Sequence, residues 1–280
     1  EVPLASTFVL STKPGAEAYV EPIVEGDGYR FSVRVGPYPM EAKSGTKISR
    51  GANFCCLLSK APIDPKHIKA EGMAGRIGQR LMAIVAEGRR GRVYLTPTEE
   101  HESLARQESP DWIPAVDFTK NSRHMTPWAY GISTFADLFT TRQLVALNTY
   151  SALVVEAKQK VLESALASGF QDDGVGLEAG GCSARAYAEA VSVYLSIFLS
   201  RMINMNNAMC SWRSDPAKQH VGHMFARQAI PMVWDFAEAN PVGVSAGSFD
   251  KTFDFIPKVF PFLPARAGGG VQQIEASENP

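Results

Sequence analysis

The chain has few cysteines and no excess of charge of either sign. Four cysteines in 280 residues, at positions 55, 56, 182 and 210, are too few to serve as a disulfide scaffold for a chain of this length. Lysine and arginine number 28 and the acidic residues 29, so the formal net charge is −1. Proteins that bind nucleic acid with their whole surface are usually basic. Any contact with DNA must therefore come from a local basic patch.

Long hydrophobic runs and targeting segments are also missing. The first residues contain no basic region followed by an apolar one, and the most apolar run, Ala190–Ile203, is too short to span a bilayer. With so few cysteines, these absences predict a cytoplasmic protein without a membrane partner. The first residue is not Met, and the chain opens in what reads as a strand, so we expect a piece of a longer protein.

The common catalytic motifs are absent as well. The sequence contains no Ser-His-Asp order, H-E-x-x-H, Walker motif or nucleophile elbow. Gly72, Gly75 and Gly78 are spaced by three without a preceding strand, so they are not a dinucleotide loop; one helix face that admits another backbone explains them better. Ala267–Gly270 has no lysine after it and is a linker.

The first 60 residues have the pattern of strands. Short β-branched or aromatic runs cover 7–10, 18–24 and 29–35, and the glycines in Glu25–Gly28 permit a hairpin turn between the last two. Another candidate strand covers 53–58. Residues 1–60 are therefore predicted to be a β-rich segment.

Helical spacing begins after Pro62. Apolar residues predict a helix over 70–87, ended by Gly88, with the stripe Met73, Ile77, Leu81, Ile84 and Val85. A short strand is expected at 92–95. Thr96 with Glu99 then has the pattern of a capping box with Pro97 at the first helical position, which predicts a helix to about Gln107.

Two longer helices follow. Thr140 and Gln143 form a second capping box that opens a helix to about Ala167. The next helix covers 183–206 and is expected to bury Tyr187, Val191, Tyr194, Leu195 and Phe198.

Shorter elements are expected toward the end of the chain. Residues 216–239 should be helical in part, 248–260 helical, and 271–274 a strand. The fold class predicted from all these segments is α+β, predominantly helical, with a short β-rich N-terminal part and a mostly helical region over 61–280.

Basic residues gather around the predicted 92–95 strand. Arg89, Arg90 and Arg92 join a helix to this strand, and Arg76 and Arg80 lie on the preceding helix. Together they could contact DNA phosphates. Ordinary solvated loop charge explains the same residues, and the sequence favours that simpler interpretation.

Other polar residues could form a metal site or a carboxylate pair. His220 and His223 are spaced so that one helix face could carry both, with Cys210 ten residues earlier. No third ligand is spaced convincingly, so a polar helix surface is the better interpretation. Asp235 and Glu238 could likewise pair on a helix, but a capped or salt-bridged helix is the better explanation.

Several long strings resemble one known family, in the same order along nearly the whole chain. They are Lys69–Gly72 running into Leu81–Gly88, then Gly91–Thr98, Phe139–Leu144 and Phe225–Pro241. They resemble the prokaryotic adenine-specific DNA methylases described as containing a zinc ribbon, which also carry an N-terminal domain of unknown function. The resemblance implies a segment of an N6-methyltransferase that uses S-adenosylmethionine.

The motifs that bind cofactor and perform chemistry in that family are not in this chain. An S-adenosylmethionine loop would lie upstream and a catalytic Asp-Pro-Pro-Tyr downstream. Asn240-Pro241 is followed by Val242-Gly243, and Asn279-Pro280 does not follow a hydrophobic strand. We therefore expect no catalytic residue and no cofactor bound by this chain alone. Residues 61–280 are interpreted as the insert between the cofactor and catalytic motifs of a fragment.

The resemblance also suggests a substrate-side role. In the family's chemistry the target adenine is flipped out of the duplex into a pocket. We hypothesise that polar and aromatic residues of the last string line or brace that pocket: Arg227, Trp234, Asp235, Glu238 and Asn240. An equally good alternative is a helix that braces the methyltransferase core. The partners implied are DNA and the remainder of the methyltransferase polypeptide.

The zinc ribbon of the family is incomplete here. Relatives have a cysteine pair just before a segment like Val2–Leu4, and some have a second pair near Cys56. This chain has C-x-x-S at Cys56–Ser59, so one thiolate is lost. The resemblance therefore implies a degenerate, metal-free ribbon-like segment over 1–60.

Two functions from other classes remain open. One is a stand-alone nucleic-acid-binding module without enzymatic activity, which would use the five arginines between 76 and 92 on phosphates. The other is a metal-dependent enzyme built on His220, His223 and Asp235.

Overall fold

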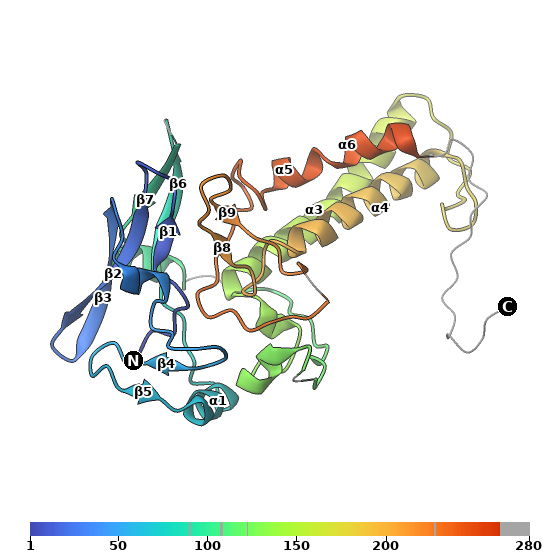
Figure 1. The fold of residues 1–280 in the computed structure, drawn as a ribbon. Coiled ribbons are helices and arrows are strands. Elements are labelled where there is room, and N and C mark those ends of the chain that lie inside the picture. The colour runs from blue at the N-terminus through green and yellow to red at the C-terminus, as the bar shows by residue number, and fades with distance from the viewer. Residues whose placement is uncertain (90, 107–108, 122, 227, 264–280) are drawn as a thin grey trace.

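The computed structural model describes residues 1–263, except 90, 107–108, 122 and 227. The fold is α+β, as predicted: small antiparallel sheets lie at one end, and a helical arm extends at the other (Figure 1). Helices account for 33% of the residues, so a predominantly helical chain is not confirmed. The expected linker at 267–270 and strand at 271–274 lie outside the described residues.

A three-stranded antiparallel sheet forms the N-terminal end. Its order is β1 (Val9–Ser11), β2 (Ala18–Glu25), β3 (Gly28–Val35), which confirms the three strands predicted there. Gly26 takes a φ of 58° in the β2–β3 turn, a conformation that glycine adopts without steric cost. One face of the sheet is buried in a hydrophobic cluster through Val20, Phe31 and their neighbours.

Two hairpins and a short helix follow the sheet. After the 3-10 turn η1 (Met40–Lys43) come β4 (Phe54–Cys55), β5 (Pro62–Ile63) and α1 (Pro65–Met73). Asp64 caps α1 by accepting a hydrogen bond from the Lys66 amide. Strands β6 (Ile84–Gly88) and β7 (Gly91–Leu95) then pair as a hairpin next to the N-terminal sheet.

The helix predicted over 70–87 is wrong. Helix α1 ends at Met73, and Gly75 follows with a φ of 67°. The apolar residues Ile84 and Val85, assigned to a helical stripe, instead pair with Leu95 and Tyr94 in β6–β7. Glycine disfavours helix, and a β-branched pair suits a strand, so local preference and pairing both oppose the helical spacing.

The strand expected at 92–95 is confirmed, but the cap after it is misplaced. Helix α2 (Glu99–Leu104) begins two residues later than predicted, at Glu99 instead of Pro97. Its capping box joins Thr98 to His101. The Thr96 hydroxyl does not cap the helix and instead accepts a hydrogen bond from the Val33 amide. A tertiary contact therefore removes the first threonine from capping.

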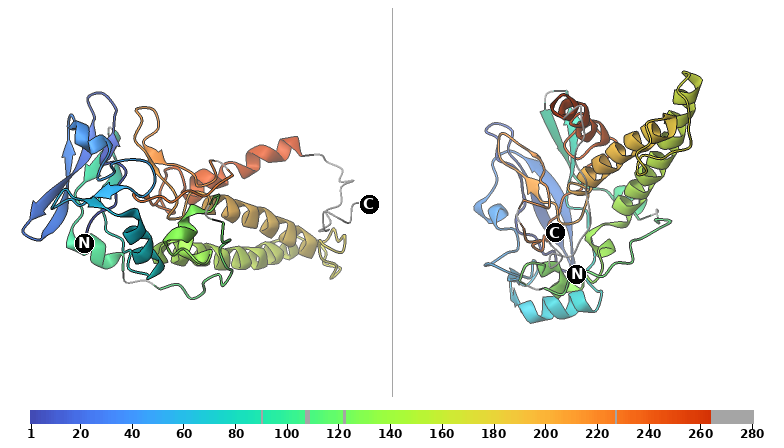
Figure 2. Two further views of the ribbon diagram at one scale, coloured as in Figure 1. Left: turned by 60° about the horizontal axis from the view of Figure 1, so that its bottom comes forward. Right: turned by 90° about the vertical axis from the view of Figure 1, so that its right-hand side faces the viewer.

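Two long helices pack side by side to make the arm. They are α3 (Thr141–Ala167) and α4 (Ala184–Ile203), and Figure 2 shows them together in both further views. The capping box of Thr140 and Gln143 is present as predicted. The expected burial of α4 is wrong at Tyr187 and Tyr194, which are 54% and 36% exposed. Each ring meets a single aromatic side chain, Phe170 and Phe260 respectively, which leaves much of its surface uncovered.

Helix α4 meets the length and composition of a membrane span. Its 20 residues exceed the run 190–203 considered from the sequence, and its mean hydropathy is 1.2. Only 22% of that apolar window is buried. Core helices of soluble proteins pass the same criterion, so length and composition do not assign α4 to a membrane. The helix presents an exposed apolar face.

After α4 the chain returns as irregular chain with one hairpin between the sheet and the arm, and short helices then follow the arm beside α4 (Figure 1). The elements are β8 (Trp212–Arg213), β9 (His220–Val221), α5 (Phe249–Phe253), α6 (Ile256–Val259) and η4 (Phe260–Phe262). They confirm helix in 248–260. The Trp212 indole donates to the Leu10 carbonyl at 2.7 Å and so ties β8 to the N-terminal sheet.

Partial helix over 216–239 is wrong for the described residues. The amides there bond to distant segments: Met224 to the Asn204 carbonyl, Ile230 to His124 and Ala237 to Cys210. Two 3-10 turns, η2 (Thr126–Tyr130) and η3 (Ala136–Leu138), pack in the same region. Such non-local bonds satisfy the backbone without a helix.

Candidate functional site

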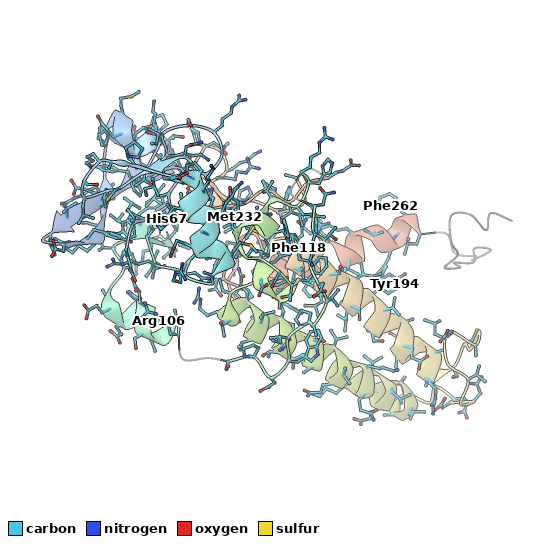
Figure 3. All side chains as sticks on the ribbon, turned by 90° about the horizontal axis from the view of Figure 1, so that it is seen from below. His67, Arg106, Phe118, Tyr194, Met232 and Phe262 are labelled. Carbon is cyan, nitrogen blue, oxygen red and sulfur yellow. The ribbon has the colours of Figure 1, made fainter. Side chains whose placement is uncertain are left out.

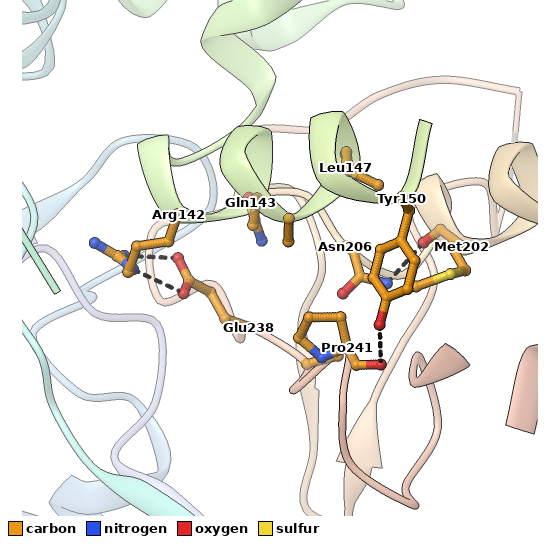
Figure 4. A pocket seen from close by; sticks show the side chains of 10 residues that line it. Arg142, Gln143, Leu147, Tyr150, Met202, Asn206, Glu238 and Pro241 are labelled. Atoms are coloured by element: carbon orange, nitrogen blue, oxygen red, sulfur yellow. Dashed lines mark hydrogen bonds and ion pairs between the residues drawn. The ribbon is translucent and has the colours of Figure 1, made fainter. Parts of the chain in front are cut away.

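A small pocket with both polar and apolar side chains lies where the N-terminal part of α3 meets residues 238–241. Because it contains an ion pair, we call it the polar pocket. Figure 4 shows its lining residues. Arg142 and Glu238 form a two-fold hydrogen-bonded ion pair, with N···O distances of 3.1 and 2.7 Å. Arg142 also donates to the Ala105 carbonyl at 3.0 Å. Planar guanidinium–carboxylate pairs of this kind fix the relative orientation of the two side chains. The start of α3 and Glu238 are therefore held in a defined position relative to each other.

Gln143 supplies an unused donor to this pocket. Its side chain is 6% exposed, and its Oε1 accepts from the Thr140 amide at 2.9 Å. Its Nε2 has no hydrogen-bond partner among the described residues. A buried polar atom without a partner costs about 1–3 kcal/mol. The cavity of 60 Å³ is large enough for water or one polar group of a ligand.

A larger apolar pocket adjoins the polar one through Tyr150 and Pro241, which line both. Its volume is 490 Å³, within the range of small-molecule sites. Tyr150 and Phe249 lie nearly parallel there, with ring centroids 5.2 Å apart. The Tyr150 hydroxyl donates to the Pro241 carbonyl at 3.1 Å. Together the pockets offer stacked aromatic rings beside an amide donor and an ion pair.

Of the described residues predicted to line a substrate cleft, Glu238 lines one of these two pockets and the others line neither. Asn240 is exposed and accepts from the Val242 amide in a turn. Arg227 lies outside the described residues. Trp234 packs edge-on against Phe54 and Tyr130 in a hydrophobic cluster.

No helix carries Asp235 and Glu238, so their expected pairing on a helix face is wrong. Burial raises the pKa of the Asp235 carboxyl, and hydrogen bonds from the Ser6 and Thr7 amides and the Ser6 hydroxyl offset this only in part. Asp235 therefore has a structural place beside the N-terminal segment. Trp234 and Asp235 support the alternative of bracing, not of substrate contact.

The raised pKa of Asp235 predicts a pH-dependent stability. A carboxyl with a raised pKa in the folded state stabilises it below the unfolded pKa, and this contribution is lost as pH rises through the folded pKa. Asp235→Asn should therefore gain stability relative to the wild type as pH rises from about 3 to 7. Urea unfolding across that range measures the difference.

Asp137 is the matched control with the opposite sign. Burial acts to raise its pKa, but hydrogen bonds from the Thr134 and Ser133 amides and their hydroxyls outweigh burial, so the pKa is lowered. Asp137→Asn should lose stability above about pH 4. A constant difference between wild type and Asp235→Asn at every pH would refute the burial argument.

The predicted arginine patch is largely neutralised by neighbouring carboxylates. Arg76 binds Glu71 at 2.7 Å, Arg92 lies 3.2 Å from Glu87, and Arg80 lies 3.8 Å from Glu102. Arg80 also stacks over the Tyr29 ring at 4.5 Å.

The five arginines are also not gathered at one place. The end of α1 and the β6–β7 turn lie at opposite ends of the sheet region (Figure 1). Arg89 is exposed at that turn, and Arg90 lies outside the described residues. The structure therefore does not join the arginines between 76 and 92 into one patch.

The histidine pair is not on a helix either. His220 lies in β9 with its Nδ1 2.7 Å from the Val221 carbonyl oxygen, and His223 is exposed in the loop that follows. Within the described part of the chain, no group of three or more His, Cys, Asp or Glu side chains is placed to hold a metal ion. The metal-dependent alternative therefore has no cluster to support it there.

The C-x-x-S turn holds a thiol with a lowered pKa. Hydrogen bonds from the Ser59 side chain and from the Ser59 and Leu58 amides lower the pKa of Cys56, with a smaller effect of Lys60. The Ser59 amide lies 3.5 Å from the Cys56 sulfur. Cys210, in contrast, is buried, which raises its pKa to about 11. The metal-free ribbon stays a prediction.

Comparison of the chain with protein-family models, curated proteins and solved structures finds no match in any of the three.

Proposed function

We propose that this chain is an interior segment of an adenine-specific DNA N6-methyltransferase that uses S-adenosylmethionine. In this proposal it forms part of the substrate side of the DNA cleft and does not catalyse methyl transfer alone. One observation carries the proposal. The two family-like strings at 139–144 and 225–241 meet in the polar pocket, through the ion pair of Arg142 and Glu238, which are 96 residues apart in sequence.

The chemistry of the paired pockets supports a nucleobase as ligand. Stacking of a base on an aromatic ring contributes about 1–3 kcal/mol, and Tyr150 and Phe249 present such rings. A glutamine amide matches the edge of adenine, and Gln143 has a free donor. A flipped adenine is read in this way, by stacking and by hydrogen bonds to its edge.

Exposed apolar surface on the arm supports a covering partner. Tyr187, Val193 and Ile197 on α4, and Phe255 and Phe262 near the end of the described chain, are all more than a third exposed. Contiguous patches of this kind in soluble proteins mark interaction sites. The remainder of the methyltransferase polypeptide is the partner we propose.

The described residues do not fit S-adenosylmethionine. Apolar side chains line most of the larger pocket, and Asp250 is the one charged residue there. The cofactor has an amino-acid group and a ribose, which require several polar partners. No glycine-rich loop after a strand is present in the sequence. We therefore assign no residue of this chain to the cofactor.

Base binding can be tested with 2-aminopurine, a fluorescent adenine analogue, placed opposite an abasic site in a DNA duplex. Binding of the chain should change the fluorescence as the base leaves the stack. Tyr150→Ala should weaken this response about tenfold, because a stacking ring is lost. Tyr187→Ala removes an exposed tyrosine of α4 and is the matched control.

Two outcomes would contradict the proposal. An unchanged 2-aminopurine signal on saturation with DNA would remove the base-binding role of the pocket. Transfer of a radiolabelled methyl group to DNA by this chain alone would show that it is a complete enzyme.

The second candidate is a nucleic-acid-binding module without enzymatic activity. It is favoured by one feature: among the described residues, no carboxylate lies within 4.0 Å of Lys60, Lys66 or Lys69, which lie on α1 or just before it. This function requires DNA binding without any 2-aminopurine response.

A further inference from the structure

Positive charge is concentrated in residues 43–69. This segment contains five lysines and one arginine but one acidic residue, Asp64, and has a net charge of +5. The other residues of the chain carry 22 basic and 28 acidic side chains, a net charge of −6. A near-neutral chain thus contains a strongly basic segment. The six cations are Lys43, Lys47, Arg50, Lys60, Lys66 and Lys69.

These cations differ from Arg30, Arg34 and Arg76 in forming no ion pair. In the described part of the chain, no carboxylate lies within 4.0 Å of any of the six. Arg30, Arg34 and Arg76 are bound to Glu25, Glu21 and Glu71, each at 2.7 Å. An unpaired cation presents its full charge to a partner, whereas the neighbouring carboxylate offsets part of the field of a paired one.

One packed unit carries the basic segment. Lys47 pairs with Phe54 across a β-bridge, and Phe54 pairs with Ile63 in β4–β5. Ile68 of α1 packs in the same small cluster as Phe54. Lys60 lies in the β4–β5 turn. The unit is therefore held together through its core, although its strands are short.

The unit lies at the outer edge of the sheet end. Figure 1 shows β4, β5 and α1 next to one another, and Figure 3, seen from below, shows α1 in front of the sheet with His67 on it. Arg50, Lys60, Lys66 and Lys69 are all exposed. Lys47 lies 5.7 Å from the Phe54 ring centre, a cation–π contact that keeps its ammonium group near the unit.

We propose that residues 43–69 form a surface that binds the phosphates of duplex DNA. This surface binds DNA of any base sequence. Lysine binds phosphate as a point charge and does not read bases as a planar arginine pair does. The high charge density of the duplex matches several cations on one rigid unit. The proposal shares DNA as partner with the proposed function, but it names a different surface from the pocket of Arg142 and Glu238.

The test compares two triple variants that lose the same charge. Lys60→Gln, Lys66→Gln and Lys69→Gln together remove three unpaired cations. Arg30→Gln, Arg34→Gln and Arg76→Gln together remove three paired ones. Binding of a labelled duplex of about 20 base pairs is followed by fluorescence anisotropy at several salt concentrations. Thermal unfolding by circular dichroism confirms that each variant is folded.

The lysine variant should bind on the order of 10- to 100-fold more weakly near 50 mM salt. The slope of log K against log salt should decrease by about 2.7, since each lost phosphate contact removes roughly 0.9. The arginine variant should change the slope by less than about 1.

Equal losses in both variants, or none in either, would overturn the proposal. So would binding to anionic phospholipid vesicles without binding to DNA. The 2-aminopurine response at saturating DNA separates this surface from the pocket. A lysine variant that keeps the response shows that the surface alone was altered. If Tyr150→Ala loses the 2-aminopurine response but keeps the wild-type salt slope, the pocket was altered and the lysine surface was not.

Discussion

Gly72→Ala should lower the free energy of unfolding by about 2–3 kcal/mol, because no methyl group fits at this position of α1. A Cβ there would lie 2.8 Å from the carbonyl carbon of Tyr130 and 2.9 Å from its Cα. These are backbone atoms, which cannot rotate away as a side chain does. The clash outweighs the gain of up to about 1 kcal/mol that alanine brings to a helix.

The opposing backbone is equally restricted. Gly131 takes a φ of 91°, and a Cβ there would lie 2.7 Å from the Gly72 carbonyl carbon. Helix α1 and η2 therefore approach through two glycines. Separation of the two would displace Tyr130, which packs on Trp234 with ring centroids 4.8 Å apart.

Gly78→Ala is the matched control for this prediction. No atom lies within 4 Å of its added Cβ, and its φ is not in the left-handed region. The substitution should be neutral or stabilise by about 0.4–1 kcal/mol, because alanine restricts the unfolded chain. Urea unfolding of both variants gives the comparison. Equal effects at positions 72 and 78 would contradict the close-approach argument.

These glycines show what residue spacing can and cannot predict. A spacing of three predicted one helix face that admits another backbone, and Gly72 alone has this place. Gly75 ends the helix region with a positive φ, and Gly78 lies in open chain. Which glycine meets a neighbour depends on the position of Tyr130, 58 residues later in the sequence, and local pattern contains no such information.

Elements with local signals could be predicted well. The capping box of Thr140 and Gln143 gave the start of α3, and the glycines after Glu25 gave the β2–β3 hairpin. The prediction of partial helix over 216–239 was wrong because amides in this segment bond to carbonyl groups far along the chain. Strand β6 was predicted as helix because its apolar residues fit helical spacing and strand pairing equally well. Tertiary pairing decided both cases.

The candidate site could be predicted only in part. Glu238 was named from the sequence, but its partner Arg142 and the buried amide of Gln143 were not. Both lie in the family-like string at 139–144, which was the one available signal. The arginine pairs with Glu71 and Glu87 had a signal too, since each carboxylate lies five residues before its arginine across a turn.

Phe54→Ala should destabilise the protein by about 3–5 kcal/mol, the usual cost of removing a buried aromatic side chain. Phe54 is 0% exposed, pairs with Ile63 and packs edge-on against Trp234 at 5.2 Å between ring centroids. Its ring therefore joins the lysine-bearing unit of β4–β5 and α1 to Trp234.

Phe262→Ala separates this effect from the general loss of a phenylalanine. Phe262 is 85% exposed, so its substitution should change the free energy of unfolding by less than about 0.5 kcal/mol. Urea unfolding followed by circular dichroism measures both variants. A loss below about 1.5 kcal/mol in Phe54→Ala would mean that the β4–β5 and α1 unit does not depend on this ring. Because Lys47, Lys60, Lys66 and Lys69 are positioned by that unit, a destabilised but folded Phe54→Ala should also bind duplex DNA with a lower salt slope.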